Sequence, residues 1–303
     1  MISTFTGFIK QSLLGVGHYR RALAQTTLPG VAVLCYHGVR DDDMAAGTIP
    51  FQYLHIPAST CESHCRLIRE CCDPISLDDW RAASARRAPL PKRPVLITFD
   101  DGYRSVLAKG APILQRYGLP AAVFVCSGPM VTRQKLWFDG IAEQDGEDAV
   151  EAWKSCDYRS WGSCAGTTAL DERDARALMT PAELGTLAAI PGIEIGGHTV
   201  RHPILARANA IEQRQEIEPN LQSIAQWTGK PVRAFAYPNG RPNLDYSATT
   251  VDILRESGID IAFTTRPVFA RAEEPPLERS RFLMLDETSD AELAHRLVYS
   301  WPR

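Results

Sequence analysis

The sequence predicts an α/β fold with a parallel sheet, either barrel-like or open. Apolar runs typical of strands alternate with stretches typical of helices along the whole chain, which favours this class. Several of the runs end in a polar residue followed by glycine. The 303 residues suffice for one large domain of α/β-barrel size or for two smaller ones. The hydrophobic fraction of 45% and the charged fraction of 23% are ordinary for a globular protein.

Each expected strand is a short run of β-favouring residues bounded by turn signals. The clearest is residues 95–99, Val-Leu-Ile-Thr-Phe, where Asp100-Asp101-Gly102 marks the turn that follows. With the helix expected over residues 105–117 and the strand over 121–125, it forms a βαβ unit with parallel strands. The other expected strands are residues 31–38, 74–77, 192–197, 234–237, 261–265 and 278–285.

The helices between these strands carry recognisable ends. Ser59, with Glu62 three residues later, predicts the N-cap of a helix that runs to residue 72. Thr180 followed by a proline predicts another helix start, and Gly118 predicts a helix end. Further helices are expected from residue 78 and over 208–228, 251–257 and 290–298.

The domain organisation expected is an N-terminal helical extension over residues 1–30 and one large domain over residues 31–303. Residues 140–175 have a weaker pattern and are interpreted as an insertion with helical pieces. In the extension, Phe5, Phe8, Ile9, Leu13 and Val16 recur at roughly helical spacing. This pattern predicts a helix packed on the domain, with peripheral contact to a membrane surface as the alternative. It includes no run long and apolar enough for a membrane span and no signal peptide.

Eight cysteines are present without the compact spacing of a disulfide scaffold. Cys61, Cys65, Cys71 and Cys72 are interpreted as buried reduced thiols on an amphipathic helix, with a zinc cluster as the alternative. Reduced thiols and the absence of a signal peptide predict a location in the cytoplasm or at the inner face of the cytoplasmic membrane. The net charge of -3 argues against a nucleic-acid partner.

Four polar motifs follow expected strands directly: Tyr36-His37-Gly38, Asp100-Asp101-Gly102, His198-Thr199-Val200-Arg201-His202 and Tyr237-Pro238-Asn239-Gly240. In a parallel sheet the carboxyl ends of the strands meet at one edge, where ligands bind. We therefore expect the four motifs to cluster. The alternatives are a solvated Asp-Asp-Gly turn and two surface histidines.

The spacing of His198 and His202 would place both imidazoles on one face of a helical turn, within reach of one cation. Two histidines and one carboxylate make a three-ligand site with an open position, as in catalytic zinc sites. Such ligands also suit cobalt, nickel or iron. The second aspartate can then act as a base, His37 as an acid, and a backbone N–H near Tyr237 as an oxyanion donor.

The strings Thr98-Phe99-Asp100-Asp101-Gly102, His198-Thr199-Val200-Arg201-His202 and Phe235-Ala236-Tyr237-Pro238-Asn239-Gly240 resemble the ordered signature of the polysaccharide deacetylases, carbohydrate esterase family 4. The resemblance runs from about residue 31 to the last helix. It implies a distorted parallel (β/α) barrel with fewer than eight strands. The reaction it implies is metal-dependent removal of acetyl groups from N-acetylated sugars.

The resemblance also implies roles for individual residues. Asp100 would be the general base, and Asp101, His198 and His202 would be the metal ligands. Tyr237 would supply the N–H that stabilises the oxyanion. The Arg-x-Pro-Tyr form of the third motif is absent, so the sequence does not show what orients Asp100.

Many family members carry the acid histidine in a late Leu-x-His motif. His295 is a poor match for it and is expected to be structural. Leu34-Cys35-Tyr36-His37 instead resembles the early Tyr-His motif of the biofilm-polysaccharide deacetylases, which makes His37 the expected acid. Four further residues are expected to contact the substrate: Trp137, Asp139, Pro238 and Asn239.

The function expected is a metal-dependent N-deacetylase that acts on an N-acetylated amino sugar in a glycan or a glycan precursor. One alternative is an amidohydrolase or O-acetyl esterase with the same site. Another is an idle glycan-binding protein, which the presence of all four metal-site and base residues disfavours.

Overall fold

The computed structural model describes residues 2–156 and 174–299. Its strands are β1 (Ala32–Tyr36), β2 (Gly38–Arg40), β3 (His55–Pro57), β4 (Asp73–Pro74), β5 (Pro94–Phe99), β6 (Ala121–Val125), β7 (Ile193–Gly197), β8 (Ala234–Ala236), β9 (Ile261–Phe263) and β10 (Phe282–Leu283). Its α-helices are α1 (Ile2–Gly15), α2 (His18–Gln25), α3 (Ala58–Cys71), α4 (Leu77–Ser84), α5 (Ala111–Tyr117), α6 (Ser127–Thr132), α7 (Trp137–Asp145), α8 (Glu147–Lys154), α10 (Pro181–Ala188), α11 (Ala210–Thr228), α12 (Ala248–Glu256) and α13 (Asp290–Tyr299).

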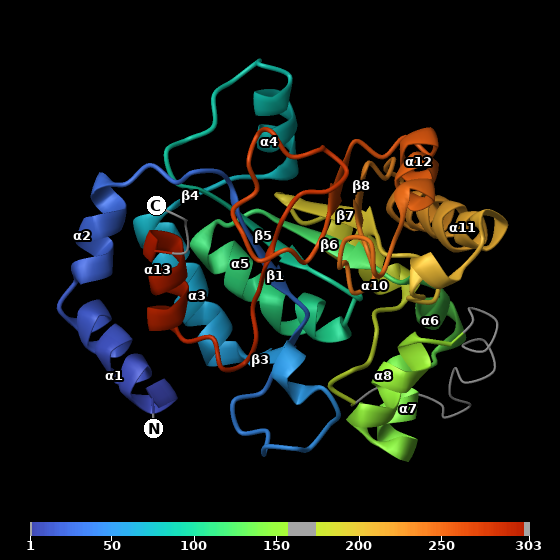
Figure 1. Cartoon of the computed structure of the whole chain (residues 1–303), viewed down its shortest axis with the longest axis horizontal. Helices are drawn as coiled ribbons and strands as arrows, with labels where there is room; N and C mark the ends of the chain where they lie inside the picture. Colours follow the sequence, from blue (N-terminus) through green and yellow to red (C-terminus); the bar gives the residue numbers. More distant parts are fainter. Residues whose placement is uncertain (1, 157–173, 300–303) are drawn as a thin grey trace.

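The main sheet is parallel and curls around a buried core, with helices packed outside it (Figure 1). Seven strands form a continuous path in the order β10-β1-β5-β6-β7-β8-β9, and the two-residue β4 pairs with the start of β5. Arg279 forms a bridge to Phe263 at the end of β9, and Phe282 pairs with Leu34 on β1. Residues 279–282 therefore contact β9 at one end of this strand order and β1 near the other end. The predicted distorted barrel with fewer than eight strands is confirmed.

Several predicted helix ends are confirmed and one is wrong. Thr180 and Glu183 form a capping box at the start of α10, and Gly118 ends α5 with φ 60°. Ser59, by contrast, lies inside the first turn of α3, which begins at Ala58. Its hydroxyl and N–H both donate to Asp42, so a loop contact replaces the predicted cap.

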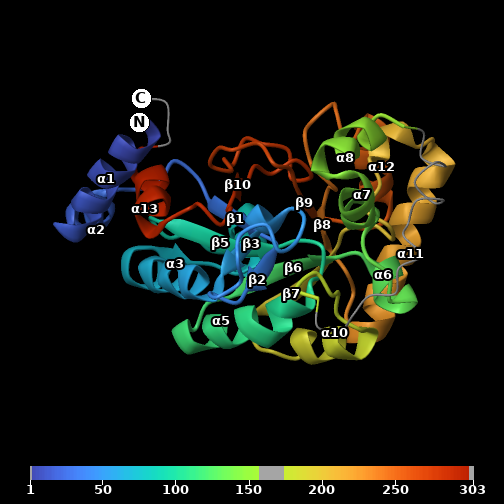
Figure 2. The same ribbon diagram turned by 90° about the horizontal axis from the view of Figure 1, so that it is seen from below.

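The two N-terminal helices, α1 and α2, pack against the C-terminal helix α13. Helices α2 and α13 also pack against α3, so these four helices form one group on the same side of the molecule (Figures 1 and 2). Leu13 and Leu14 contact the core, whereas Phe8 is 72% exposed. Within residues 2–156 and 174–299, no helix is both long enough and apolar enough to cross a membrane. The predicted insertion of residues 140–175 lies partly outside the described residues; α7 and α8 cover its first part.

The cysteines of α3 and the residue after it are buried and free, as expected for reduced thiols. Among the described residues, the clusters that could hold a metal ion lie elsewhere, at the carboxyl ends of β1, β5, β6 and β7. The alternative of a zinc cluster at Cys61, Cys65, Cys71 and Cys72 is therefore not supported.

Candidate active site

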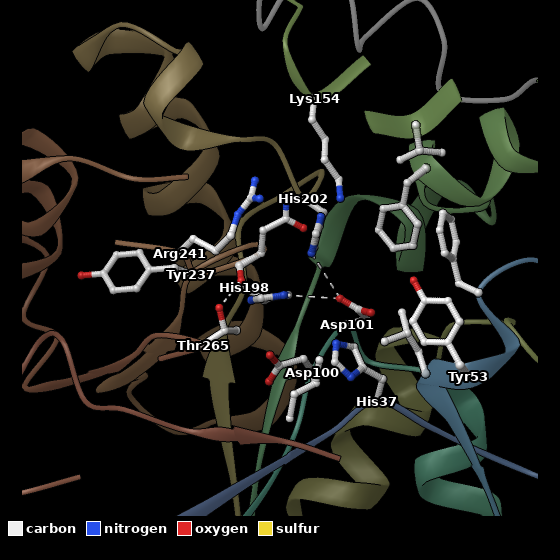
Figure 3. A pocket seen from close by; sticks show the side chains of 16 residues that line it. His37, Tyr53, Asp100, Asp101, Lys154, His198, His202, Tyr237, Arg241 and Thr265 are labelled. Atoms are coloured by element: carbon white, nitrogen blue, oxygen red, sulfur yellow. Dashed lines mark hydrogen bonds and ion pairs between the residues drawn. The ribbon is translucent and has the colours of Figure 1, made fainter. Parts of the chain in front are cut away.

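A cavity of about 300 Å³ opens at the carboxyl ends of the strands (Figure 3). Most of its polar lining comes from segments that follow strands: His37, Asp100, Asp101, His198, His202, Tyr237, Asn239, Arg241 and Thr265. Phe51, Tyr53 and Phe138 supply aromatic surface, and Lys154 of α8 adds a cation. The predicted clustering of the four motifs at one edge of the sheet is thus what the structure shows.

One carboxylate oxygen and two imidazoles converge in this cavity. Asp101 Oδ1 lies 3.3 Å from His198 Nε2 and 3.5 Å from His202 Nε2 (Figure 3). This oxygen is buried and has no hydrogen-bond partner within the described part of the chain. A buried acceptor without a donor is costly, so the arrangement fits a cation held among these three atoms.

The electrostatics of His202 and Asp101 fit the same interpretation. Burial lowers the pKa of His202 to about 3, so its imidazole is neutral and able to bind a cation. Burial raises the pKa of Asp101, but the two imidazoles outweigh this effect, and the pKa lies below its usual value. His198 Nδ1 lies 2.7 Å from the carbonyl oxygen of Ala236, which fixes the ring with Nε2 toward Asp101.

The His-x-x-x-His segment is a turn and not the predicted helical turn. Thr199 and His202 have φ values of 70° and 60°, in the left-handed region. The Thr199 side chain accepts a hydrogen bond from the His202 N–H at 3.0 Å, which closes the turn. Pro203 follows directly, and a residue before proline is disfavoured in a helix. The two imidazoles meet all the same, with ring centroids 4.9 Å apart.

Asn220 of α11 holds this turn, although no sequence motif indicated this role. Its side-chain amide donates to Val125 O, Ser127 Oγ and Thr199 O and accepts from the His198 N–H. The side chain is fully buried. One amide from a distant helix therefore positions the first metal-ligand candidate.

Cys126 also lies near Asp101 and His198. Burial raises the pKa of its thiol well above the usual value, and Sγ donates to the carbonyl oxygen of His198 at 3.2 Å. A protonated thiol is a poor metal ligand. His202 is thus the better third ligand.

Asp100 is paired with Arg281, a functional residue that the sequence analysis missed. Arg281 donates from Nη1 to Oδ1 and from Nη2 to Oδ2, both at 2.7 Å. Burial raises the pKa of Asp100, but Arg281 and the nearby imidazoles outweigh it, so the pKa is lowered. Asp100 is thus a fixed carboxylate in the state that can accept a proton. Arg281 supplies the orientation that the third motif does not.

His37 lines the cavity, and Figure 3 shows its ring next to Asp101. Its Nδ1 is buried without a partner among the described residues. His295 does not line the cavity; it lies in α13, where Nδ1 is 3.1 Å from the Tyr19 hydroxyl. The structure therefore brings the early histidine, and not the late one, to the other motif residues.

The residues expected to contact substrate need correction. Trp137 and Asp139 are buried and do not line the cavity, where Phe138 lies instead. Neighbouring helix residues face different directions, which explains the difference. Trp137 Nε1 donates to the carbonyl oxygen of His202 at 2.8 Å, so this side chain supports the ligand turn. Pro238 does not line the cavity either, whereas Asn239 does.

The predicted oxyanion donor also needs correction. The Tyr237 N–H donates to the carbonyl oxygen of Phe263 at 3.2 Å, as part of the pairing between β8 and β9. The Tyr237 hydroxyl donates to Leu277 O at 2.8 Å, and its ring stacks on Tyr246. Both donors of Tyr237 are thus engaged within the fold.

A family model described as polysaccharide deacetylase matches residues 87–262. The chain belongs to the polysaccharide deacetylase family. The matched range contains Asp100, Asp101, His198 and His202. His37 and Arg281 lie outside this range, so the family match does not itself assign a role to either residue.

Individual relatives agree with this membership. Over 93 residues the chain is 32% identical to the poly-beta-1,6-N-acetyl-D-glucosamine N-deacetylase of Escherichia coli K12. That stretch covers 30% of this chain and 13% of the relative, so the chain spans only a small part of that protein.

Solved structures show the same fold. The Streptococcus pyogenes deacetylase PplD, in complex with acetate, has a TM-score of 0.66 at 19% identity and is covered over 99% of its length by 89% of this chain. IcaB from Ammonifex degensii has a TM-score of 0.63 at 20% identity, with 89% of this chain and 97% of that one covered. A de-N-acetylase from Aggregatibacter actinomycetemcomitans has a TM-score of 0.65 at 20% identity, with 87% and 98% covered.

Proposed function

We propose that this chain is a metal-dependent hydrolase that removes acetyl groups from an N-acetylated amino sugar in a glycan or a glycan precursor. The observation that carries the proposal is the convergence of Asp101 Oδ1 with two imidazole Nε2 atoms, beside the separately held carboxylate of Asp100. Two adjacent acids in different environments can take different roles. Family membership and the relative named as an N-acetyl-D-glucosamine N-deacetylase support the choice of reaction.

Asp101, His198 and His202 would hold the cation, most simply zinc, although the nitrogen and oxygen ligands also suit cobalt, nickel or iron. A cation bound there supplies positive charge that polarises the acyl group and makes water easier to deprotonate. Side chains of the protein carry out every other step of the reaction.

Asp100 takes the proton from the attacking water. Arg281 keeps this carboxylate ionised and prevents it from rotating, since both of its oxygens accept from the guanidinium. The Cys35 thiol also donates to Oδ2 at 3.4 Å. His37 would donate a proton to the departing amine, because its ring lies beside Asp101 in the cavity and an imidazolium can act as a general acid.

The cavity walls fit a sugar with one reactive substituent. Phe51, Tyr53 and Phe138 give an apolar surface, and polar side chains surround the metal-ligand candidates (Figure 3). Ligand sites typically combine an apolar lining with a few placed polar groups.

Acetate release from a panel of substrates tests the proposal. The panel contains N-acetylated oligosaccharides of several linkages, lipid-linked N-acetyl sugars, O-acetylated sugars and simple acetamides. We expect release from at least one N-acetylated sugar, its loss after chelation, and its recovery when a divalent metal is restored.

Two results would contradict the proposal. Turnover of O-acetyl esters or simple acetamides alone would favour the alternative hydrolase. Binding of glycans by the metal-loaded protein without any turnover would favour the idle binding protein.

A further inference from the structure

Asn239 places an unpaired donor in the cavity. Its side chain lines the same cavity as the metal-ligand candidates. The Nδ2 atom is buried and has no hydrogen-bond partner within residues 2–156 and 174–299. Buried amide groups are normally paired, and an exception needs an explanation. A ligand that accepts a hydrogen bond in the cavity provides one.

The backbone around Asn239 is fixed. Its φ of 55° is in the left-handed region, which asparagine tolerates better than most residues. Thr265 Oγ1 donates to the carbonyl oxygen of Asn239 at 2.7 Å, and the Thr265 N–H donates to that of Gly240 at 3.0 Å. The turn is therefore anchored to the end of β9, and the amide is presented from a rigid support.

The turn also lies next to a metal-ligand candidate. Ala236, three residues before Asn239, contacts His198 Nδ1 through its carbonyl oxygen at 2.7 Å. The segment that carries Asn239 is thus tied both to the His198 imidazole and to β9.

The donors of the two preceding residues are not available for the same task. The Tyr237 N–H and hydroxyl are both engaged, as described above. Proline at position 238 has no N–H. Among residues 237–239, the amide of Asn239 is the side-chain donor that is buried and still without a partner.

We propose that Asn239 Nδ2 donates a hydrogen bond to the acyl oxygen of the substrate while that oxygen carries negative charge. The inference rests on the proposed function. In amide hydrolysis the oxygen gains charge when the water oxygen bonds to the acyl carbon, and loses it when the carbon–nitrogen bond breaks and the amine takes a proton. A preorganised donor aimed at that oxygen stabilises the transition state more than the substrate.

Two variants and a matched control test this role. Asn239→Gly removes the amide and suits the positive φ, so the fold should be kept. Asn239→Asp keeps the shape but replaces the donor by a carboxylate. Asn243→Gly is the control, because Asn243 has φ 63°, is exposed and does not line the cavity.

With the N-acetylated sugar found active in the panel, we expect Asn239→Gly to lower kcat by about 10²–10³-fold with KM within about threefold of wild type. Asn239→Asp should be slower still at neutral pH, because its charge repels the oxyanion. Asn243→Gly should match wild type, and metal content and thermal unfolding should be unchanged in all three.

A kcat of Asn239→Gly or Asn239→Asp within about threefold of wild type would overturn the inference. A change in KM alone would also overturn it, since it would indicate binding of the ground state. A wild-type protein without turnover contradicts the proposed function and the inference together, whereas an active wild type with an unaffected Asn239→Gly contradicts only the inference.

Discussion

Replacing Arg281 with methionine should disturb the orientation of the base, Asp100, without removing the metal. Arg281 is fully buried and contacts both oxygens of Asp100, but it contacts none of the three metal-ligand candidates through a hydrogen bond in the structure. Methionine has similar length without the charge. We expect Arg281→Met to keep its metal and to lose both stability and turnover.

The size of the stability loss follows from the geometry. Removing one partner of a buried ion pair costs on the order of 3–5 kcal/mol, because the remaining charge is left without compensation. Arg281 Nε also donates to Thr264 O at 3.0 Å, and losing that bond costs about 1 kcal/mol more. Misplacement of Asp100 should lower turnover roughly a hundredfold.

The double variant Asp100→Asn/Arg281→Met removes the unpaired charge. Its destabilisation should therefore be smaller than the sum of the two single variants, by on the order of 1–3 kcal/mol. Arg281→Lys keeps the charge but not the two-pronged geometry, so its stability and turnover should be intermediate.

Urea unfolding and acetate release on the same samples measure both effects. Additive destabilisation in the double variant, or normal turnover in Arg281→Met, would refute the role given to this pair. Loss of metal from Arg281→Met would show instead that Arg281 supports the metal site.

Three further predictions concern His37, His64 and Trp137. His37→Ala should lower turnover of an N-acetyl sugar by about 10²–10⁴-fold and that of an activated acetate ester much less, while His295→Ala stays near wild type; the reverse pattern would assign the acid to His295. Burial lowers the pKa of His64 below 6.5, so the unfolded chain binds a proton there that the folded chain does not. The resulting stability is present above about pH 6.5 and is lost as the pH falls, by up to about 1.4 kcal/mol per pH unit, and urea unfolding of His64→Gln at pH 7.5 and 5.5 should show a shallower loss than wild type. Trp137→Phe removes the donor to the His202 carbonyl and should weaken metal binding about 10–100-fold in competition with a chelator; unchanged affinity would contradict a supporting role.

The sequence predicted the location of the site well because strand ends determine it. Once the strands were taken as parallel, the motifs after β1, β5, β7 and β8 had to meet at one edge of the sheet. His37, Asp101, His198 and Asn239 all line the cavity as a result. This argument needs no knowledge of distances.

The supporting residues could not be found in the same way. Arg281 and Asp100 are 181 positions apart, and Asn220 of α11 contacts His198 from 22 positions further along the chain. Such contacts depend on how the sheet curls, which local patterns do not show. An arginine inside the strand expected over residues 278–285 was the available signal, because a charge in a buried strand needs a partner.

Two errors had local causes. The turn over His198–His202 was expected to be helical, although the proline at position 203 already disfavoured a helix there. Tyr237 was expected to offer its N–H to the substrate, but a parallel partner strand takes that N–H first. Its neighbour Asn239 then becomes the better candidate donor.

Metal content and turnover of Asp100→Asn, measured on one preparation, test the central claim most directly. The claim is that adjacent carboxylates divide the work, with Asp101 binding the cation and Asp100 acting as the base. We predict that Asp100→Asn, purified without chelator, retains one divalent metal per chain while acetate release falls by about 10²–10⁴-fold. An Asp100→Asn protein that has lost its metal, or that still releases acetate at the wild-type rate, would contradict the claim.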